Sequence, residues 1–272
     1  ADRYILGADN TLSSGVRYEF REEPSFDSRA IDADVQIRHD LDAAHHVTYG
    51  YRIRIEEARD RAAAIRGAEF DRSRAAGLFS SLVHDTRDDR LFPRRGVFAE
   101  GGLFWSSAAL GADLQFLEWH GSWARYVPLG DGTVLAVGAR FATRELLDGA
   151  TTLPIQERLF LGGETSVRSF REGELGPTGR DGDPKGGLTS AVASVELRQR
   201  LWRELDGALF YDVGTVSPEA FDVGRDAGAA VGVGLRYRLP VGPVRLDVGY
   251  NPLHRFGADR RWAVHLSFGF SF

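Results

Sequence analysis

The chain has 272 residues, a net charge of −5 and 27% charged residues, a balance that gives no reason to expect a nucleic-acid partner. It has no cysteine, which excludes disulfides and thiolate metal sites, and no run of 18 or more uncharged apolar residues, which excludes a transmembrane helix. Strands that cross a membrane alternate apolar and polar residues, so a membrane location stays open.

Apolar and polar side chains alternate with a period of two along the whole chain, which is typical of β-strands with two different faces. In one such segment, Val47, Tyr49 and Tyr51 alternate with Thr48 and Gly50. The periodicity predicts twelve strands, at 13–21, 30–39, 45–57, 75–85, 95–105, 112–126, 132–145, 187–202, 206–216, 227–239, 242–251 and 262–272.

These segments fit either a soluble β-sandwich or a transmembrane β-barrel, because both alternate with a period of two. The barrel is favoured because most segments have roughly 9–14 residues, the length that a tilted bilayer crossing needs. Arginine, glutamate and glycine crowd the polar faces, which suits a wet lumen. Aromatic residues gather near strand ends, as in interfacial girdles: Trp105, Trp119, Trp123, Tyr126, Tyr250 and Trp262. The sequence therefore predicts an all-β fold, an antiparallel transmembrane β-barrel.

The connections between predicted strands alternate between short and long. Short ones include 40–44 and 128–132, and the long ones are 58–74, 146–186 and 217–226. This asymmetry predicts short periplasmic turns and long extracellular loops. The even strand number predicts that the first and last strands lie side by side and close the barrel.

Several motifs occur in a fixed order within residues 85–272. The longest loop contains L-F-L-G-G-E-T-S-V-R-S-F from Leu159 to Phe170, and the second strand after it contains F-Y-D-V-G from Phe210 to Gly214. A turn with the pattern D-x-R-D-x-x-x-x-P-x-x-G spans 85–96, and an aromatic alternating strand ends at Phe272. Together these motifs resemble the outer membrane protein 85 superfamily, the BamA/TamA-type barrels that insert or translocate other proteins.

The resemblance implies a set of site residues. In the family the loop tip reads V-R-G-F or V-R-G-Y, and here Ser169 stands at the glycine position. The tip is expected to fold into the lumen, where Arg168 pairs with Glu196, Asp212 or both. The residues of this expected lock are Val167, Arg168, Ser169, Phe170, Glu196, Asp212 and Gly214. The expected C-terminal barrel signal and seam comprise Leu266, Phe268, Gly269, Phe270 and Phe272.

The resemblance also bears on domain organisation. A family barrel has sixteen strands, five of them after the loop, whereas this sequence predicts seven before the loop and five after it. We expect a single barrel domain over 1–272, with loop 146–186 folding into the lumen and periplasmic POTRA domains absent from this chain. Either four N-terminal strands lie outside the chain, which we favour, or the barrel is smaller.

The leading functional hypothesis is an assembly or translocation barrel of the bacterial outer membrane. Its first and last strands would form a weak seam at which a strand of a client protein pairs. The implied partners are the lipid bilayer, client outer-membrane or autotransporter proteins, and periplasmic or inner-membrane accessory proteins, with no nucleic acid. The mechanism needs no catalytic residue, cofactor or metal, because backbone hydrogen bonds in lipid drive the pairing.

Three alternatives belong to other classes. One is a secretion barrel of a two-partner or patatin-type autotransporter system, which sequence outside this chain would distinguish. A lipid-modifying barrel enzyme needs a Ser–His pair near the rim, and none is evident; adjacent His45 and His46 face opposite sides of a strand and cannot chelate one ion. A passive porin is disfavoured because an inserted loop narrows the pore.

Overall fold

The computed structural model describes residues 9–60, 72–147, 149–150, 152–179, 182–224, 226–253 and 261–269. Among these residues, no helix has the length and apolar character needed to cross a membrane.

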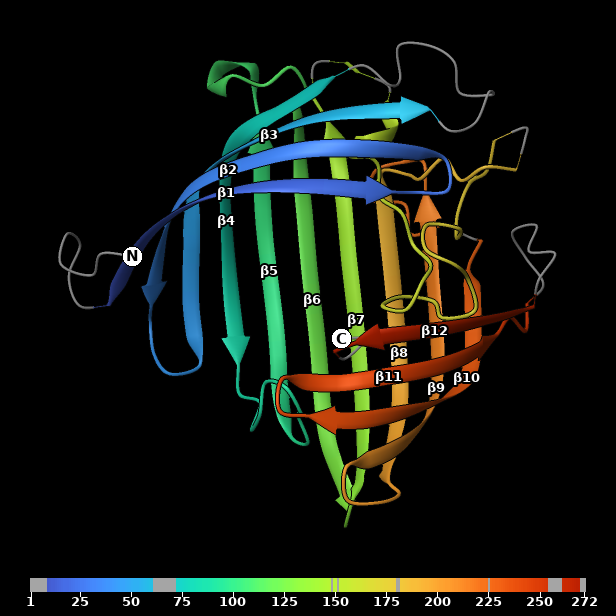
Figure 1. Cartoon of the computed structure of the whole chain (residues 1–272). Helices are drawn as coiled ribbons and strands as arrows, with labels where there is room; N and C mark the ends of the chain where they lie inside the picture. Colours follow the sequence, from blue (N-terminus) through green and yellow to red (C-terminus); the bar gives the residue numbers. More distant parts are fainter. Residues whose placement is uncertain are drawn as a thin grey trace.

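The fold is one antiparallel sheet in which each strand pairs with its neighbours in the sequence, from β1 to β12 (Figure 1). Its strands are β1 Asn10–Glu22, β2 Phe26–Asp40, β3 His45–Asp60, β4 Ser73–Asp85, β5 Gly96–Ser106, β6 Phe116–Gly130, β7 Thr133–Leu146, β8 Thr189–Arg200, β9 Leu205–Ser217, β10 Gly228–Leu239, β11 Gly242–Tyr250 and β12 Trp262–Phe268. Two short 3-10 turns, η2 and η3, span Ala108–Leu110 and Ile155–Glu157. The all-β class and all twelve predicted strands are confirmed.

The two faces of the sheet have inverted polarity compared with a soluble protein. Apolar side chains on the convex face are exposed, as with Val16 at 81% and Leu266 at 73%. The largest fully buried side chains include arginines, and Arg168 and Arg236 are both 0% exposed on the concave side. A soluble sandwich would bury the apolar rows and expose the charges. The arrangement therefore favours the transmembrane β-barrel over the soluble β-sandwich. The apolar outer face contacts lipid, and the polar inner face lines the interior.

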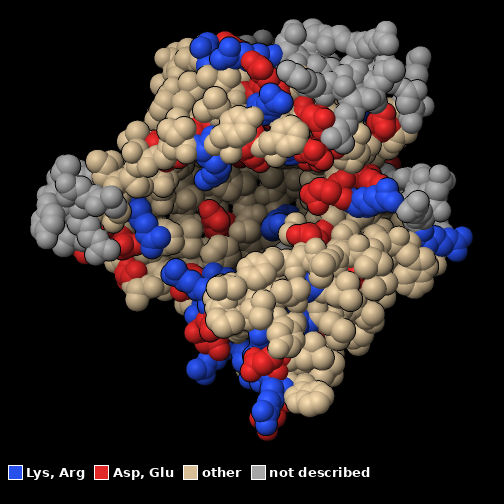
Figure 2. Space-filling view, in the orientation of Figure 1, with Lys and Arg blue, Asp and Glu red and all other residues tan. Residues whose placement is uncertain are grey.

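The predicted closure of the barrel is wrong for the described residues, because β1 and β12 do not pair. In Figure 1, β1–β3 curve across one side and β10–β12 across the other, and Figure 2 shows a hollow lined by charged residues between them. The long loop between β7 and β8, residues 147–188, places its tip at 167–170 in the interior, against the concave face. Within the described residues, the outer edges of β1 and β12 pair with no other strand.

The D-x-R-D turn forms a compact connection between β4 and β5. Arg87 donates two hydrogen bonds to Asp85, each of 2.9 Å. One oxygen of Asp88 accepts from the backbone N–H groups of Arg94 and Arg95, at 2.9 and 3.1 Å. Gly96 has a φ of 105°, and a Cβ there would lie 2.3 Å from the Thr86 carbonyl oxygen. The motif thus encodes a turn whose polar groups form hydrogen bonds with one another, and the glycine at which the turn ends.

Candidate functional site

The tip of loop 147–188 is a four-residue turn pressed against the inner face of β8–β11. The backbone N–H of Phe170 donates to the Val167 carbonyl at 3.1 Å, which closes the V-R-S-F segment into a β-turn. Val167 and Phe170 pack with Leu175, Val192 and Phe210 in a buried apolar cluster. The apolar residues of the tip therefore hold the arginine between them at a fixed depth.

Arg168 is held on three sides by groups of two neighbouring strands. Its Nε and Nη2 donate to the two oxygens of Asp212 on β9, at 2.9 and 2.8 Å, and its Nη1 donates to Glu196 on β8 at 2.7 Å. Its guanidinium carbon lies 3.5 Å from the centroid of the Phe210 ring. All three charged side chains are fully buried. This is the two-pronged arginine–carboxylate geometry with a stacked aromatic face, the arrangement in which arginine cannot be replaced by lysine without loss.

The charge of Arg168 is secured by its surroundings. Burial by itself would lower the pKa of the guanidinium, but the hydrogen bonds to Asp212 and the charges of Glu196 and Asp247 raise that pKa above its ordinary value. The side chain therefore stays positively charged at any physiological pH.

The ion pairs of Arg168 belong to a network that extends across four strands, β8 to β11. Arg236 on β10 donates to Glu196 at 2.8 Å and to Asp247 on β11 at 2.6 Å. Arg198 donates to the other oxygen of Glu196 at 2.7 Å. Every carboxylate of the set thus faces at least one buried arginine, which is the condition under which charges are tolerated away from bulk water.

Glycines let the tip approach the wall closely. A Cβ at Gly249 would lie 2.1 Å from the carbonyl oxygen of Arg168, and one at Gly214 would lie 2.9 Å from a Val167 methyl. The Ser169 hydroxyl donates to the Ala229 carbonyl at 2.8 Å. Among the described residues, Phe221 is the single non-glycine with positive φ, so Ser169 needs no glycine-like backbone. The departure from the family tip therefore adds a hydrogen bond and keeps the turn.

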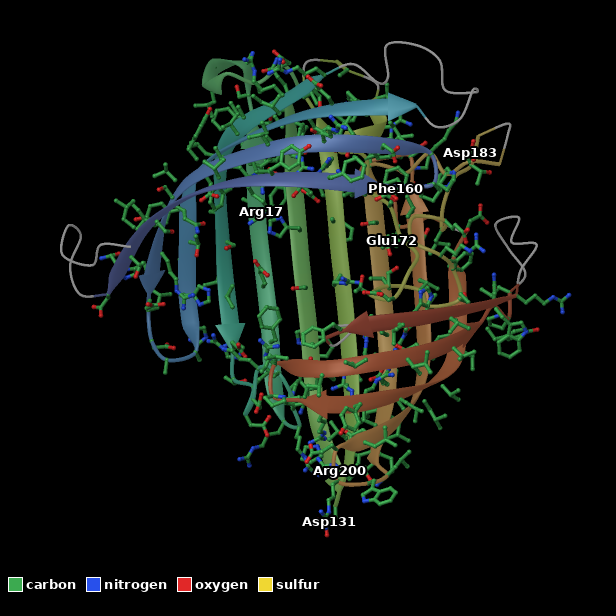
Figure 3. All side chains as sticks on the ribbon, viewed as in Figure 1. Arg17, Asp131, Phe160, Glu172, Asp183 and Arg200 are labelled. Carbon is green, nitrogen blue, oxygen red and sulfur yellow. The ribbon has the colours of Figure 1, made fainter. Side chains whose placement is uncertain are left out.

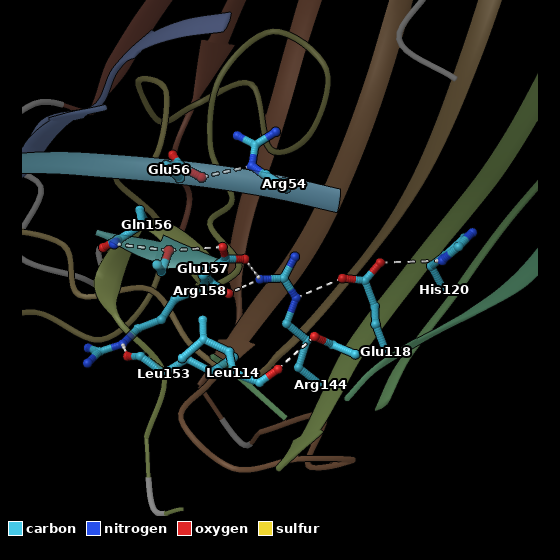
Figure 4. A network of polar contacts seen from close by, with 12 residues as sticks. Arg54, Glu56, Leu114, Glu118, His120, Arg144, Leu153, Gln156, Glu157 and Arg158 are labelled. Atoms are coloured by element: carbon cyan, nitrogen blue, oxygen red, sulfur yellow. Dashed lines mark hydrogen bonds and ion pairs between the residues drawn. The ribbon is translucent and has the colours of Figure 1, made fainter. Parts of the chain in front are cut away.

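The root of the same loop is held by a second network of polar contacts (Figure 4). Arg144 at the end of β7 donates to Glu118 at 2.7 Å, and it also donates to the backbone carbonyl and, at 3.3 Å, to the carboxylate of Glu157 in η3. The Ser73 hydroxyl at the start of β4 donates to the other oxygen of Glu157 at 3.3 Å. Glu157 is 3% exposed, so it joins β4 and β7 through a buried carboxylate.

The first three strands reach the same root. Arg21 of β1 donates to Glu56 of β3 at 2.9 Å and to the Gln156 carbonyl at 3.4 Å. Arg54 donates to the second oxygen of Glu56 at 2.8 Å. Ile155 packs with Phe26 in a buried cluster. Loop 147–188 therefore contacts both ends of the sheet, with its root at β1–β4 and its tip at β8–β12.

We expect Glu157→Gln to loosen the root by about 1–2 kcal/mol, because the amide still accepts from Ser73 but no longer pairs with the Arg144 charge. The matched control is Glu174→Gln, in the same loop, whose Arg171 contact is solvent-exposed. Thermal melting of the detergent-solubilised protein measures the difference. Equal melting points for the two variants would show that the root is not held by this charge.

Glu172 follows the tip and borders an interior cavity of about 460 Å³. Figure 3 shows it in the opening between β1 and β12 in that view. Burial, followed by the charges of Glu23 and Glu164, raises the pKa of Glu172 to about 7, against the lowering effect of Arg140. The side chain keeps surface exposed toward the hollow, so the effect on loop docking is smaller than full burial would give.

The raised pKa of Glu172 predicts pH-dependent docking of the loop. The docked state binds more protons than the released state between the unperturbed pKa of 4.5 and about 7, so docking is favoured at low pH and weakens as the pH rises through this window. We expect protease cleavage of the loop to be slower at pH 5 than at pH 8, and Glu172→Gln to remove most of that difference. An unchanged pH dependence in this variant would assign the effect to another group.

The structure brings together most of the site residues named from the sequence, at the contacts given above for Val167 to Phe170, Glu196, Asp212 and Gly214. At the C-terminal signal, Leu266 and Phe268 point outward from β12, and the strand ends at Phe268 because Gly269 turns with a φ of 92°. Phe270 and Phe272 lie outside the described residues. The described part of the predicted final strand is thus Trp262–Phe268.

Sequence reasoning missed four residues of the site: Phe210 as the stacking partner, Arg236, Asp247 and Gly249. The alternating pattern placed all four residues in strands, and it placed Arg236 and Asp247 on the polar face. It does not say which polar residues of different strands contact one another. The pairing of β10 with β11 could have indicated the contact between Arg236 and Asp247. Asp247 lies opposite Gly234, two residues from Arg236 on the same face of β10.

Comparison with known proteins gives consistent matches along the chain. A family model described as the Omp85 superfamily domain matches residues 1–272. The outer membrane protein assembly factor BamA of Nitratidesulfovibrio vulgaris is 25% identical over 224 residues, which is 79% of this chain and 28% of that protein. The chain thus spans less than a third of this curated relative.

Solved structures share the fold at lower sequence identity. BamA from Haemophilus ducreyi lacking POTRA domains 1–3 matches with a TM-score of 0.79 and 17% identity, covering 98% of this chain and 59% of that one. CdiB from Acinetobacter baumannii matches with a TM-score of 0.60 and 12% identity, covering 90% and 42%. These likenesses support the arrangement of strands described above.

Proposed function

Because the chain belongs to the Omp85 superfamily and is a β-barrel protein of the bacterial outer membrane, we propose that it helps other β-barrel or autotransporter proteins to insert into or cross that membrane. Its proposed partners are the bilayer, the client proteins and periplasmic or inner-membrane accessory proteins. The activity requires no cofactor or catalytic residue, because a strand that pairs in lipid gains backbone hydrogen bonds that water cannot replace there.

The observation that carries the proposal is the pair of free strand edges that face the hollow. Of the strands that the structure describes, β1 pairs with β2 and β12 with β11, and neither pairs with a further strand. Their outward side chains are apolar and exposed, with Val16 at 81% and Leu266 at 73%. An exposed edge with an apolar outer face is a template for another strand. A client strand added to β1 would continue both the hydrogen-bond ladder and the lipid-facing surface.

The fastened loop also favours this function over passive diffusion. Its tip is held by Arg168 at β8–β11, and its root is held by Glu157 and Gln156 near β1–β4. The loop thereby occupies space in the interior that an open pore would need for conduction. It also keeps the two halves of the wall in place while the edge strands remain available.

A pair of proline substitutions tests whether the free edge of β1 receives clients. Successive N–H groups of an antiparallel strand point alternately toward and away from the neighbour. Of Val16→Pro and Arg17→Pro, one therefore removes a β1–β2 hydrogen bond and the other removes only an N–H on the free edge, where proline is tolerated.

We expect the variant that loses only the free N–H to keep heat-modifiable migration on gels. It should nevertheless slow the folding of an outer-membrane client into vesicles that contain the protein. The variant that breaks the β1–β2 ladder serves as the structural comparison. Client folding at the unmodified rate in both variants would rule out pairing at this edge.

A further inference from the structure

The convex wall carries a groove that the function proposed above does not use. It has a volume of about 670 Å³ and crosses the outer face of β5–β9. One row of laterally paired positions forms its floor: Ala99, Trp123, Ala139, Ala193 and Val213. The small alanines leave space beside the tall indole of Trp123, which is 40% exposed.

Residues 218–224, which follow β9, form one border of this groove and lie on the outside of the wall. The Thr143 hydroxyl accepts from the backbone N–H of Phe221 at 3.0 Å, and Thr189 donates to the Glu219 carbonyl at 2.8 Å. Thr143 and Thr189 are both 0% exposed. The segment 218–224 therefore covers hydroxyl groups that would otherwise face lipid without partners.

Two apolar side chains of the same segment remain exposed beside the groove. Phe221 is 52% exposed and meets the Trp119 ring edge-on at 6.4 Å, and Val223, which lines the groove, is 53% exposed. In water this placement would be unfavourable. On a wall that contacts lipid, it continues the apolar surface and places aromatic rings as an interfacial girdle does.

The charged residues that border the groove belong to the inner face. Arg140 donates to the Thr165 carbonyl of the inserted loop, which places its side chain on the concave side. Glu100 and Arg140 are each register partners of Ser122, so Glu100 lies on that same face. The groove thus offers apolar side chains and no exposed charge, and its volume falls within the roughly 300–1,000 Å³ of small-molecule sites.

We propose that this groove is a binding site for one acyl chain of a bilayer lipid, held between the alanine floor of β7–β8 and the segment 218–224. The occupant is assigned because the groove is continuous with the lipid-facing wall and is open to the bilayer. Each methylene buried there would contribute to retention of the lipid when the surrounding bilayer is removed. A polypeptide occupant would need partners for its backbone groups, and the lining provides few.

Retention of lipid after extraction tests the site. The protein is reconstituted in vesicles of phosphatidylethanolamine and phosphatidylglycerol, extracted into detergent, washed, and examined by native mass spectrometry. We expect about one phospholipid to stay with the unmodified protein, and Ala193→Phe, which fills the floor, to lower its occupancy at least tenfold. Val248→Phe adds an aromatic ring to the outer wall of β11, away from the groove, and should retain the lipid.

A second variant is needed because Ala193→Phe could lose the lipid by misfolding. Val223→Ser changes the border and leaves the strands intact, so it should lower lipid occupancy while heat-modifiable migration stays normal. Equal occupancy in all four proteins, bound detergent alone, or no retained lipid in the unmodified protein would overturn the proposal. These experiments do not test strand pairing at β1 and β12. A negative result would therefore disprove the lipid site without disproving the proposed function.

Discussion

Arg168→Ala is expected to destabilise the protein by about 3–5 kcal/mol, the cost of leaving buried charges without their partner. The substitution removes the hydrogen bonds to Asp212 and Glu196. Glu196 keeps its contacts with Arg198 and Arg236, but Asp212 loses its arginine partner in a site with 0% exposure. It also removes the cation from the Phe210 ring. The tip should then leave the wall while the strands stay folded.

Two readouts separate loss of the tip from loss of the barrel. Thermal melting reports stability, and maleimide labelling of Ser166→Cys reports the tip, because Ser166 is 4% exposed and the natural chain has no cysteine. Labelling should accelerate in Arg168→Ala and only partly return to the slow rate in Arg168→Lys, since lysine lacks the planar fork. Arg171→Ala, three residues away and solvent-exposed, is the control. Slow labelling in Arg168→Ala would show that apolar packing alone seats the tip.

The strands were predictable because their signal is local. Outward Val233 and Leu235 alternate with inward Gly234 and Arg236, and this period needs no knowledge of the rest of the chain. The ends of strands were less predictable. At β12 the described strand ends at Phe268, where the next residue, Gly269, has a positive φ.

The contacts of the site depended on long-range register. The tip motif pointed to Arg168, Glu196 and Asp212, which are in contact, whereas Arg236 and Asp247 could not be distinguished from other inward-facing charges. Strand pairing decides the difference, because it sets which charges share a level on neighbouring strands. The root contact of Glu157 had no signal at all, since η3 is too short to show a period.

The separation of β1 and β12 is likewise a property of the whole molecule. No local pattern in either strand says whether its outer edge is paired, and the alternation would be the same in a closed barrel. Loop 147–188 contacts both halves of the sheet, through Glu157 and Gln156 near β1–β4 and through Arg168 near β8–β11. A prediction of closure from strand number alone therefore failed.

Fixing β1 to β12 covalently should abolish client insertion, because the free edges are where a client strand would pair. Because the chain lacks cysteine, introduced pairs are the only thiols. Val233→Cys with Val248→Cys are register partners on β10 and β11 and should form a disulfide readily, since facing strand residues lie within disulfide range. Pairs scanned between Ser14 or Val16 of β1 and Val264 of β12 should form disulfides poorly.

A longer bismaleimide can bridge the β1–β12 pairs, and its effect on function is the decisive measurement. Client folding into vesicles should fall at least tenfold after this bridge forms, whereas the same reagent on the β10–β11 pair should leave the rate unchanged, because that seam is already closed. Each introduced cysteine alone, treated with the reagent, controls for chemical modification of an edge. If the bridged β1–β12 protein still inserts clients at the full rate, strand addition at these edges is not the mechanism. Complete disulfide formation across β1 and β12 without a spacer would contradict the separation of the edges.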